Sequence, residues 1–264
     1  TNTVLAGALA ASKLHIKVGH LESGLRSFYK GMPEEINRVL TDHCSDYLFA
    51  PTDVARENLL REGVDSEKIF VTGNTIVDAV YQNLRFAEKK KDVLDVKPGE
   101  YILVTSHRQE NVDIRDRFEG IIRGLELVYK EYGLPIIYPI HPRARKMLKH
   151  FGLETNGVKL VEPLDYLSFL YLESKARLVL TDSGGVQEET CILGVPCVTL
   201  RDNTERPETL EVGSNILVGT DPSRILEGVG IMMNKDNGWV NPYGDGKASR
   251  KIVDILEKEL MLYA

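Results

Sequence analysis

The stretch Val179-Leu180-Thr181-Asp182-Ser183-Gly184-Gly185-Val186-Gln187-Glu188-Glu189 decides the fold class of this chain. Residues 177–181 form an apolar run typical of a buried strand, the Ser-Gly-Gly at 183–185 predicts a tight turn, and a helix is expected from Val186 onward. Adjacent glycines let the backbone approach a ligand closely, and the N–H groups of a first helical turn favour an anion. The stretch therefore predicts a phosphate site. Glu188 and Glu189 lie one turn further along, where a carboxylate can bind sugar hydroxyls.

The same alternation of strand and helix continues on both sides of this stretch. Short apolar runs predict strands at 15–19, 47–50, 68–72, 101–105, 135–140, 158–161, 177–181, 196–200 and 215–218. Amphipathic segments of helical length include 1–11, 34–44, 53–62, 75–90, 115–131 and 167–174. Such alternation predicts an α/β fold of parallel sheets covered by helices.

The chain is long enough for two domains. The charged segment 88–99 ends in Pro-Gly and interrupts the rhythm, so we expect a boundary there and domains at 1–90 and 91–264, although an ordinary surface loop would read the same way. The first domain would then hold only about three strands, fewer than a doubly wound sheet usually has. We therefore expect the sequence to begin in the middle of a domain.

Composition excludes several classes of function. A net charge of -6 argues against a nucleic-acid partner, and no apolar run reaches the roughly 18 residues that a membrane span needs. Cys44, Cys191 and Cys197 are too irregularly spaced for a disulfide framework or a zinc site, and they favour core thiols in the cytoplasm. The chain has no G-x-G-x-x-G and no Walker A loop, which disfavours an NAD enzyme and a P-loop NTPase.

Two carboxylates near the N-terminus are candidates for acid/base chemistry. Glu22 follows the first predicted strand between Gly19 and Gly24, and a turn with solvated charges is an equally good interpretation of that segment. Glu34 follows Pro33 at a helix start, where spacing alone favours a carboxylate that merely complements the helix dipole. Only twelve positions separate Glu22 from Glu34. The two could therefore face one site from two sides.

The second half of the chain supplies a histidine and an arginine. His107 follows a strand at the start of the second domain, where it would face an interdomain cleft, although a structural histidine is as good an interpretation. His141 has a similar setting and a weaker case. Arg206, in Thr-Glu-Arg-Pro-Glu at 204–208, offers a second phosphate contact.

Taken together, these segments resemble the non-hydrolysing UDP-N-acetylglucosamine 2-epimerases. Their fold consists of two Rossmann-like, doubly wound parallel-sheet domains in the GT-B-like arrangement, the N-terminal one being incomplete here, with a C-terminal helix that packs back toward the first domain. The resemblance rests on eight motifs in order: GHLESGLR (19–26), PEEINR (33–38), APTD (50–53), VTGNT (71–75), VTSHR (104–108), TDSGGVQEE (181–189), TERPE (204–208) and NPYGDGKA (241–248).

The resemblance implies a reaction and a set of site residues. UDP would be eliminated from the sugar to leave 2-acetamidoglucal and would then add back with inversion at C2, with no metal and no cofactor. Glu22 and Glu34 would be acid/base or sugar-binding carboxylates, and His107 would lie near the leaving group. The UDP-binding residues would be Phe169 beside the uracil, Ser183, Gly184, Gly185 and Arg206 at the diphosphate, and Glu189 at the ribose. Leu164 would line the uracil pocket with a side chain that varies in the family.

The resemblance also implies a UDP-sugar substrate and a homodimer, with no nucleic-acid or membrane partner. Family members carry about a hundred residues ahead of Thr1, roughly half a domain, including an Arg, a Lys and a catalytic Asp. We therefore expect this segment alone to be poorly active. A second substrate site involving His141 and Arg143 is a weaker expectation. The alternatives are a GT-B glycosyltransferase, a hydrolysing epimerase, and a nucleotide-sugar sensor without turnover.

Overall fold

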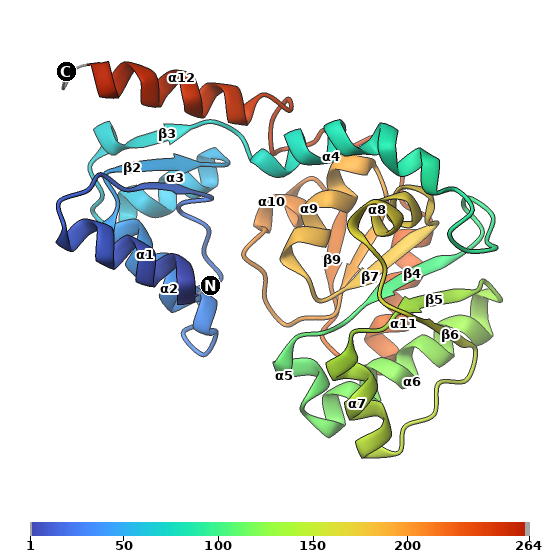
Figure 1. Cartoon of the computed structure of the whole chain (residues 1–264). Coiled ribbons are helices and arrows are strands. Elements are labelled where there is room, and N and C mark those ends of the chain that lie inside the picture. Colours follow the sequence, from blue (N-terminus) through green and yellow to red (C-terminus); the bar gives the residue numbers. More distant parts are fainter. Residues whose placement is uncertain (1, 262–264) are drawn as a thin grey trace. The chain divides into compact units, whose positions relative to one another are not determined.

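The computed structural model describes residues 2–261, which fold into two compact units (Figure 1). The first unit contains the residues up to Tyr81 and those from Pro242 onward, and the second unit is Gln82–Asn241. Each unit has one parallel sheet with helices packed on it, so the predicted α/β fold class is confirmed. The chain passes from the first unit into the second within α4 (Thr75–Ala87). The charged segment after α4 therefore belongs to the second unit.

The sheet of the second unit has six parallel strands in the order β6-β5-β4-β7-β8-β9. Their bounds are β4 (Ile102–Thr105), β5 (Ile136–Pro139), β6 (Val158–Val161), β7 (Leu178–Thr181), β8 (Cys197–Thr199) and β9 (Asn215–Leu217). The order reverses direction between β4 and β7, where Thr105 pairs with Thr181. In doubly wound sheets, ligands bind beyond the carboxyl ends of the strands at this switch point.

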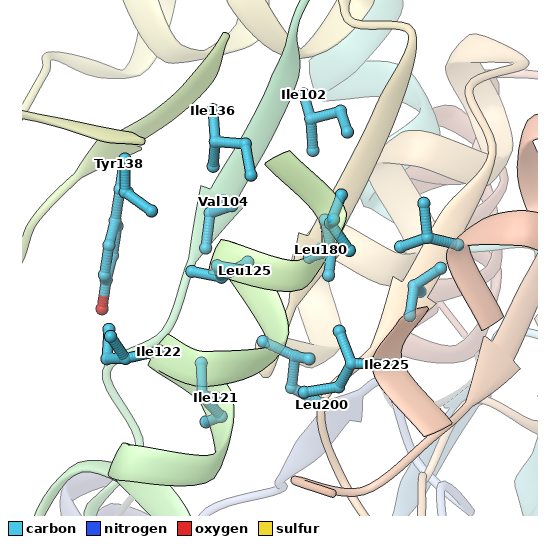
Figure 2. Close-up of a cluster of buried hydrophobic side chains, with 14 of the residues drawn as sticks. Ile102, Val104, Ile121, Ile122, Leu125, Ile136, Tyr138, Leu180, Leu200 and Ile225 are labelled. Carbon is cyan, nitrogen blue, oxygen red and sulfur yellow. The ribbon is translucent and has the colours of Figure 1, made fainter. Parts of the chain in front are cut away.

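Helices cover both faces of this sheet. On one face, α6 (Arg115–Tyr132), α7 (Pro142–Phe151) and α11 (Pro222–Met233) bury the large core shown in Figure 2, in which Ile102 and Val104 of β4 meet Leu125 of α6. On the other face, α8 (Tyr166–Lys175) and α9 (Gly184–Leu193) pack over Leu103. Adjacent residues of β4 point to opposite faces, so its uninterrupted apolar run serves both cores. The short helix α5 (Gln109–Val112) follows β4, and the short helix α10 (Pro207–Glu211) precedes β9.

The sheet of the first unit has three parallel strands in the order β1-β2-β3. They are β1 (Gly19–Leu21), β2 (Tyr47–Ala50) and β3 (Ile69–Val71). On one face, α3 (Asp53–Arg61) packs against Leu48, and on the other α12 (Ala248–Met261) places Ile252 against Phe49. In the same unit α1 (Asn2–Lys13) packs on α2 (Pro33–Cys44). The remaining elements are the 3₁₀ turns η1 (Ser66–Lys68) and η2 (Glu88–Lys90).

Two elements begin at a different residue than predicted, the first strand and the helix that follows Ser183. The strand predicted at 15–19 lies at Gly19–Leu21, because α1 runs on and is closed by His15, which has a φ of 57°, and by the bond from Ile16 N to Ala11 O. The helix predicted from Val186 begins at Gly184. Ser183 is its extended N-cap residue, so the two glycines form the first helical turn and not a turn ahead of it. The other eight predicted strands begin and end within one residue of the prediction.

The helices of residues 2–261 do not combine the length and the apolar character that crossing a membrane requires. All three cysteines are free, and Cys191 and Cys197 are buried. Burial raises the pKa of the Cys191 thiol to about 11, so this thiol is unreactive at neutral pH.

Candidate functional site

The carboxyl ends of β4 and β7 are tied together by one buried carboxylate, Asp182. Its oxygens accept hydrogen bonds from Ser106 Oγ at 2.8 Å, from the N–H groups of His107 and Arg108 at 3.0 and 3.1 Å, and from Asn111 Nδ2 at 3.2 Å. Asp182 is fully buried and directly follows β7, while the donors all follow β4. The loop that carries His107 is therefore fixed against the strand that leads into α9.

The same carboxylate orients the His107 ring. Nδ1 of His107 lies 3.3 Å from Asp182 Oδ1, and this hydrogen bond raises the pKa of His107 above its ordinary value. Burial alone would raise the pKa of Asp182, but His107 and the N–H of Arg108 lower it, so Asp182 stays ionised. With Nδ1 turned to Asp182, the half-exposed ring presents Nε2 as a proton donor.

The first turn of α9 is built to receive an anion. Ser183 caps the helix in an extended conformation, and its hydroxyl makes no capping hydrogen bond. A Cβ on Gly184 would clash with Oε1 of Glu205, whereas the nearest atom to a Cβ on Gly185 is Ser183 Oγ at 3.9 Å. A side chain at position 184 would therefore have to displace the buried Glu205 carboxylate. Gly185 instead has room for a Cβ, and it belongs to the first turn of the helix, whose N–H groups carry its partial positive charge.

Arg206 adds a cation beside this helix end. Its Nε lies 2.7 Å from Glu188 Oε1, and both side chains are buried. Glu205 lies among Arg206, Arg201 and Arg108 at 3.8, 2.7 and 3.6 Å. Burial alone would raise the pKa of Glu205, but these arginines hold it well below its ordinary value. A buried arginine oriented by carboxylates is a preformed contact for phosphate oxygens.

Glu189 lies further along α9 and faces α8. Burial raises the pKa of Glu189 to about 7, and a hydrogen bond from Tyr166 opposes the shift. Glu173 of α8 is fully buried as well, and its carboxyl oxygens find no hydrogen-bond partner among the described residues. Burial and the charge of Glu189 raise the pKa of Glu173 well above its ordinary value. Phe169, on the same helix, is half-buried and packs with Leu164 on the adjoining apolar cluster.

Glu22 and Glu34 both lie in the first unit. Glu22 follows β1, is exposed, and has a φ of 62°, which is uncommon for a residue other than glycine and is often found at functional sites. Asn74, which follows β3 at the same edge of the sheet, places Nδ2 3.5 Å from Glu22 Oε1. Glu34 is exposed on the first turn of α2, whereas Glu35 is buried and accepts from the N–H groups of Ser27 and Phe28. The two neighbouring glutamates therefore differ: Glu35 is structural and Glu34 is accessible.

A buried network holds the loop that follows Glu22. Asp42 of α2 lies 2.6 Å from His20 Nδ1 and 2.7 Å from Arg26 Nη2, and it accepts from Gly24 N at 3.1 Å. Arg26 in turn pairs with Glu62 at 2.6 Å. Three of the residues of the GHLESGLR motif are thus fixed by one carboxylate from the next helix.

Sequence reasoning located most of these groups and missed others. The second unit brings together His107, Ser183, Gly184, Gly185 and Arg206 around the β4–β7 switch point, with Glu189 and Phe169 on the adjoining α9 and α8. Sequence reasoning did not single out Asp182, Glu205 and Asp42. Asp182 could have been found, because it directly follows a buried strand. Asp42 acts through contacts distant in sequence, and Glu205 does so where it meets Arg108 and Gly184. Within residues 2–261 no three His, Cys, Asp or Glu side chains gather as a metal site.

Comparison with known proteins identifies the family. The family model described as UDP-N-acetylglucosamine 2-epimerase matches residues 1–257. The chain belongs to the UDP-N-acetylglucosamine 2-epimerase family. A relative of that name from Methanocaldococcus jannaschii is 57% identical over 266 residues, which cover 97% of this chain and 73% of the relative. The UDP-2,3-diacetamido-2,3-dideoxy-D-glucuronate 2-epimerase of Pseudomonas aeruginosa is 42% identical, over 98% of this chain and 73% of that protein.

A solved structure of an epimerase has the same fold. The M. jannaschii UDP-N-acetylglucosamine 2-epimerase in complex with UDP-N-acetylglucosamine and UDP matches with a TM-score of 0.93 at 57% identity, over 98% of this chain and 74% of that one. The resemblance stated from the eight motifs is confirmed, and the family is one of isomerases.

Proposed function

We propose that this chain interconverts UDP-N-acetylglucosamine and UDP-N-acetylmannosamine without releasing free sugar. UDP-N-acetylglucosamine 2-epimerase activity is supported by the family and by the 57% identical relative. The observation that carries the finer proposal is the preformed anion site at the β4–β7 switch point, where the start of α9 and Arg206 lie together. A reaction that passes through bound UDP needs such a site, because the diphosphate must be retained between departure and return.

The second unit would hold the UDP moiety. The helix N–H groups, the Ser183 hydroxyl and the Arg206 guanidinium would bind the diphosphate, whose charge grows as the C1–O bond breaks. Glu189 would accept hydrogen bonds from the ribose hydroxyls, and Phe169 would lie beside the uracil. His107, with Nδ1 directed to Asp182, would donate from Nε2 to the leaving group.

The proton steps fall to carboxylates of the first unit. One carboxylate would remove the C2 proton as the C1–O bond breaks, so that the C2–H electron pair becomes the C1=C2 bond of 2-acetamidoglucal and the C1–O pair leaves with UDP. In the reverse sense UDP adds to C1, and C2 takes a proton on the opposite face. Glu22 and Glu34 are the candidates because both are exposed, whereas Glu35 is engaged by backbone N–H groups.

The test is proton NMR of UDP-N-acetylglucosamine with the full-length protein in deuterated water. We expect deuterium at C2, UDP-N-acetylmannosamine as product, and little free UDP. Free UDP with free N-acetylmannosamine would identify a hydrolysing enzyme. An unchanged C2 proton would contradict the proposal and leave a transferase or a nucleotide-sugar sensor. Conversion of only a 2,3-diacetamido glucuronate would move the substrate toward that of the 42% identical relative. The homodimer and the cytoplasmic location stay predictions.

A further inference from the structure

Two buried amide side chains connect α9 with β9. Gln187 stands on α9, Asn215 begins β9, and their exposed fractions are 0% and 5%. Asn215 Nδ2 donates to Gln187 Oε1 at 3.3 Å, and Gln187 Nε2 donates to the carbonyl of Ser183 at 3.3 Å. Asn215 Oδ1 accepts from Thr199 Oγ1 at 2.8 Å. The pair is therefore anchored on the residue that caps α9.

Two threonine hydroxyls continue this network to the main chain of Arg206. Thr204 Oγ1 donates to Gln187 Oε1 at 2.7 Å and accepts from Arg206 N at 3.0 Å. Thr209 Oγ1 donates to Arg206 O at 2.8 Å and accepts from Asn215 Nδ2 at 3.1 Å. Each hydroxyl has one hydrogen to give, and a single assignment satisfies all four bonds. Both the N–H and the carbonyl of Arg206 are thus held.

We propose that Gln187, Asn215, Thr204 and Thr209 are positioning residues that fix the main chain of Arg206 against the first turn of α9. The inference rests on the proposed function, because it takes Arg206 and α9 as joint contacts of the diphosphate.

Two features of the network suit this role. Glu188 orients the guanidinium of Arg206 but does not fix the backbone from which that side chain extends. The network does so with neutral groups, which add no negative charge beside a bound diphosphate. A contact set in place before binding loses little conformational entropy when the ligand arrives.

The test is UDP binding to the 264-residue chain, measured by calorimetry. Thr204→Val removes the hydroxyl at nearly constant volume and leaves Gln187 Oε1 and Arg206 N without it, so we expect UDP to bind about tenfold more weakly. Thr204→Ser keeps the hydroxyl and should restore the affinity. Thr190→Val is the matched control, because Thr190 Oγ1 bonds the carbonyls of Val186 and Gln187 in its own helix. Its affinity should equal that of the unmodified chain.

A second comparison separates positioning from general loss of structure. In an Arg206→Ala background Thr204→Val should have little further effect, because the hydroxyl acts through Arg206. A full tenfold effect in both backgrounds, or unchanged affinity of Thr204→Val, would overturn the proposal. If Thr204→Val does not fold, Thr209→Val tests the other arm with the same expectation. An unmodified chain that folds and does not bind UDP would instead contradict the proposed function.

Discussion

Gly184 and Gly185 are neighbouring glycines whose surroundings differ. The motif at 181–189 predicted a phosphate site from both glycines, yet only at Gly184 would a side chain have to displace another residue, the buried Glu205. No sequence rule separates the two, because Glu205 arrives from a loop more than twenty positions away. Asp182 was open to prediction as a strand-end carboxylate. Its hydrogen bonds to the loop after β4 could not be predicted, because they depend on β4 and β7 being neighbours in the sheet.

The glycine pair leads to the first prediction. Gly185→Ala should keep the stability of the fold, because its Cβ meets only Ser183 Oγ at 3.9 Å. It should weaken UDP binding, because the added methyl group stands in the helical turn that we propose binds the diphosphate. Gly184→Ala should lower the free energy of unfolding by roughly 1–3 kcal/mol through overpacking, and the protein should therefore unfold at a lower temperature. Melting curves and UDP calorimetry on both variants check this. A stable Gly184→Ala or a fully binding Gly185→Ala would contradict it.

Asp182 sets the second prediction. Asp182→Asn removes the negative charge whose hydrogen bond raises the pKa of His107, so that pKa should fall. An NMR titration of the His107 ring nitrogens measures it. Asp113→Asn is the control, because it makes the same chemical change at a carboxylate that pairs with Arg143, at 2.8 Å, so the pKa of His107 should change little. Equal His107 titration in Asp182→Asn and the unmodified chain would show that the ring does not depend on this carboxylate.

At the scale of elements, α8 has an unusual buried face. The spacing of its apolar residues predicted the helix within one residue at each end, but periodicity treats Glu173 as a surface residue. In the structure Glu173 is fully buried, and Tyr166 and Glu173 of this helix both interact with Glu189 of α9.

The predicted start of β1 was wrong because local pattern alone does not show where α1 ends. The chain at 15–18 has the apolar pattern of a strand, and only the closing hydrogen bonds of α1 decide otherwise.

Glu173 carries the third prediction. Because its pKa is raised in the folded state, the unfolded chain releases this proton above about pH 4.5 while the native chain keeps it. Glu173 therefore destabilises the fold increasingly as pH rises. Glu173→Met should be more stable than the unmodified chain, and the difference should grow by about 1.4 kcal/mol per pH unit above that value. Glu189 lies beside Glu173 and titrates with it, so the difference reports on this pair of carboxyl groups.

Urea unfolding at pH 4, 6 and 8 measures the effect. Glu173→Gln serves as the matched variant, since it removes the titration but keeps a buried polar group, and it should give the same pH trend with a smaller gain. A stability difference that stays constant from pH 4 to pH 8 would mean that Glu173 does not hold its proton in the folded chain.

At the scale of the whole molecule, the polypeptide crosses between the units twice, at Tyr81–Gln82 and at Asn241–Pro242. The sequence predicted two α/β domains and the order of their elements. The return of the chain to the first unit depends on contacts that no local pattern encodes. Asn74 N donates to Tyr243 O at 2.8 Å, and Gly73, with a φ of 86°, lets that carbonyl approach. Asp78 of α4 then caps α12 across 170 positions of sequence.

This cap yields the last prediction. Asp78 is buried and accepts from Ala248 N at 3.1 Å, from Ser249 N at 3.0 Å and from Ser249 Oγ at 2.6 Å. Asp78→Ala should cost about 1–2 kcal/mol and accelerate amide exchange along α12 by roughly tenfold, because the first N–H groups of the helix lose their acceptor. Asp221→Ala is the control. Asp221 caps α11 through Ser223 N and Arg224 N at an exposed position, so its loss should leave exchange in α12 unchanged. Equal exchange in α12 for both variants would mean that the apolar contact of Ile252 with Phe49 holds the helix without the cap.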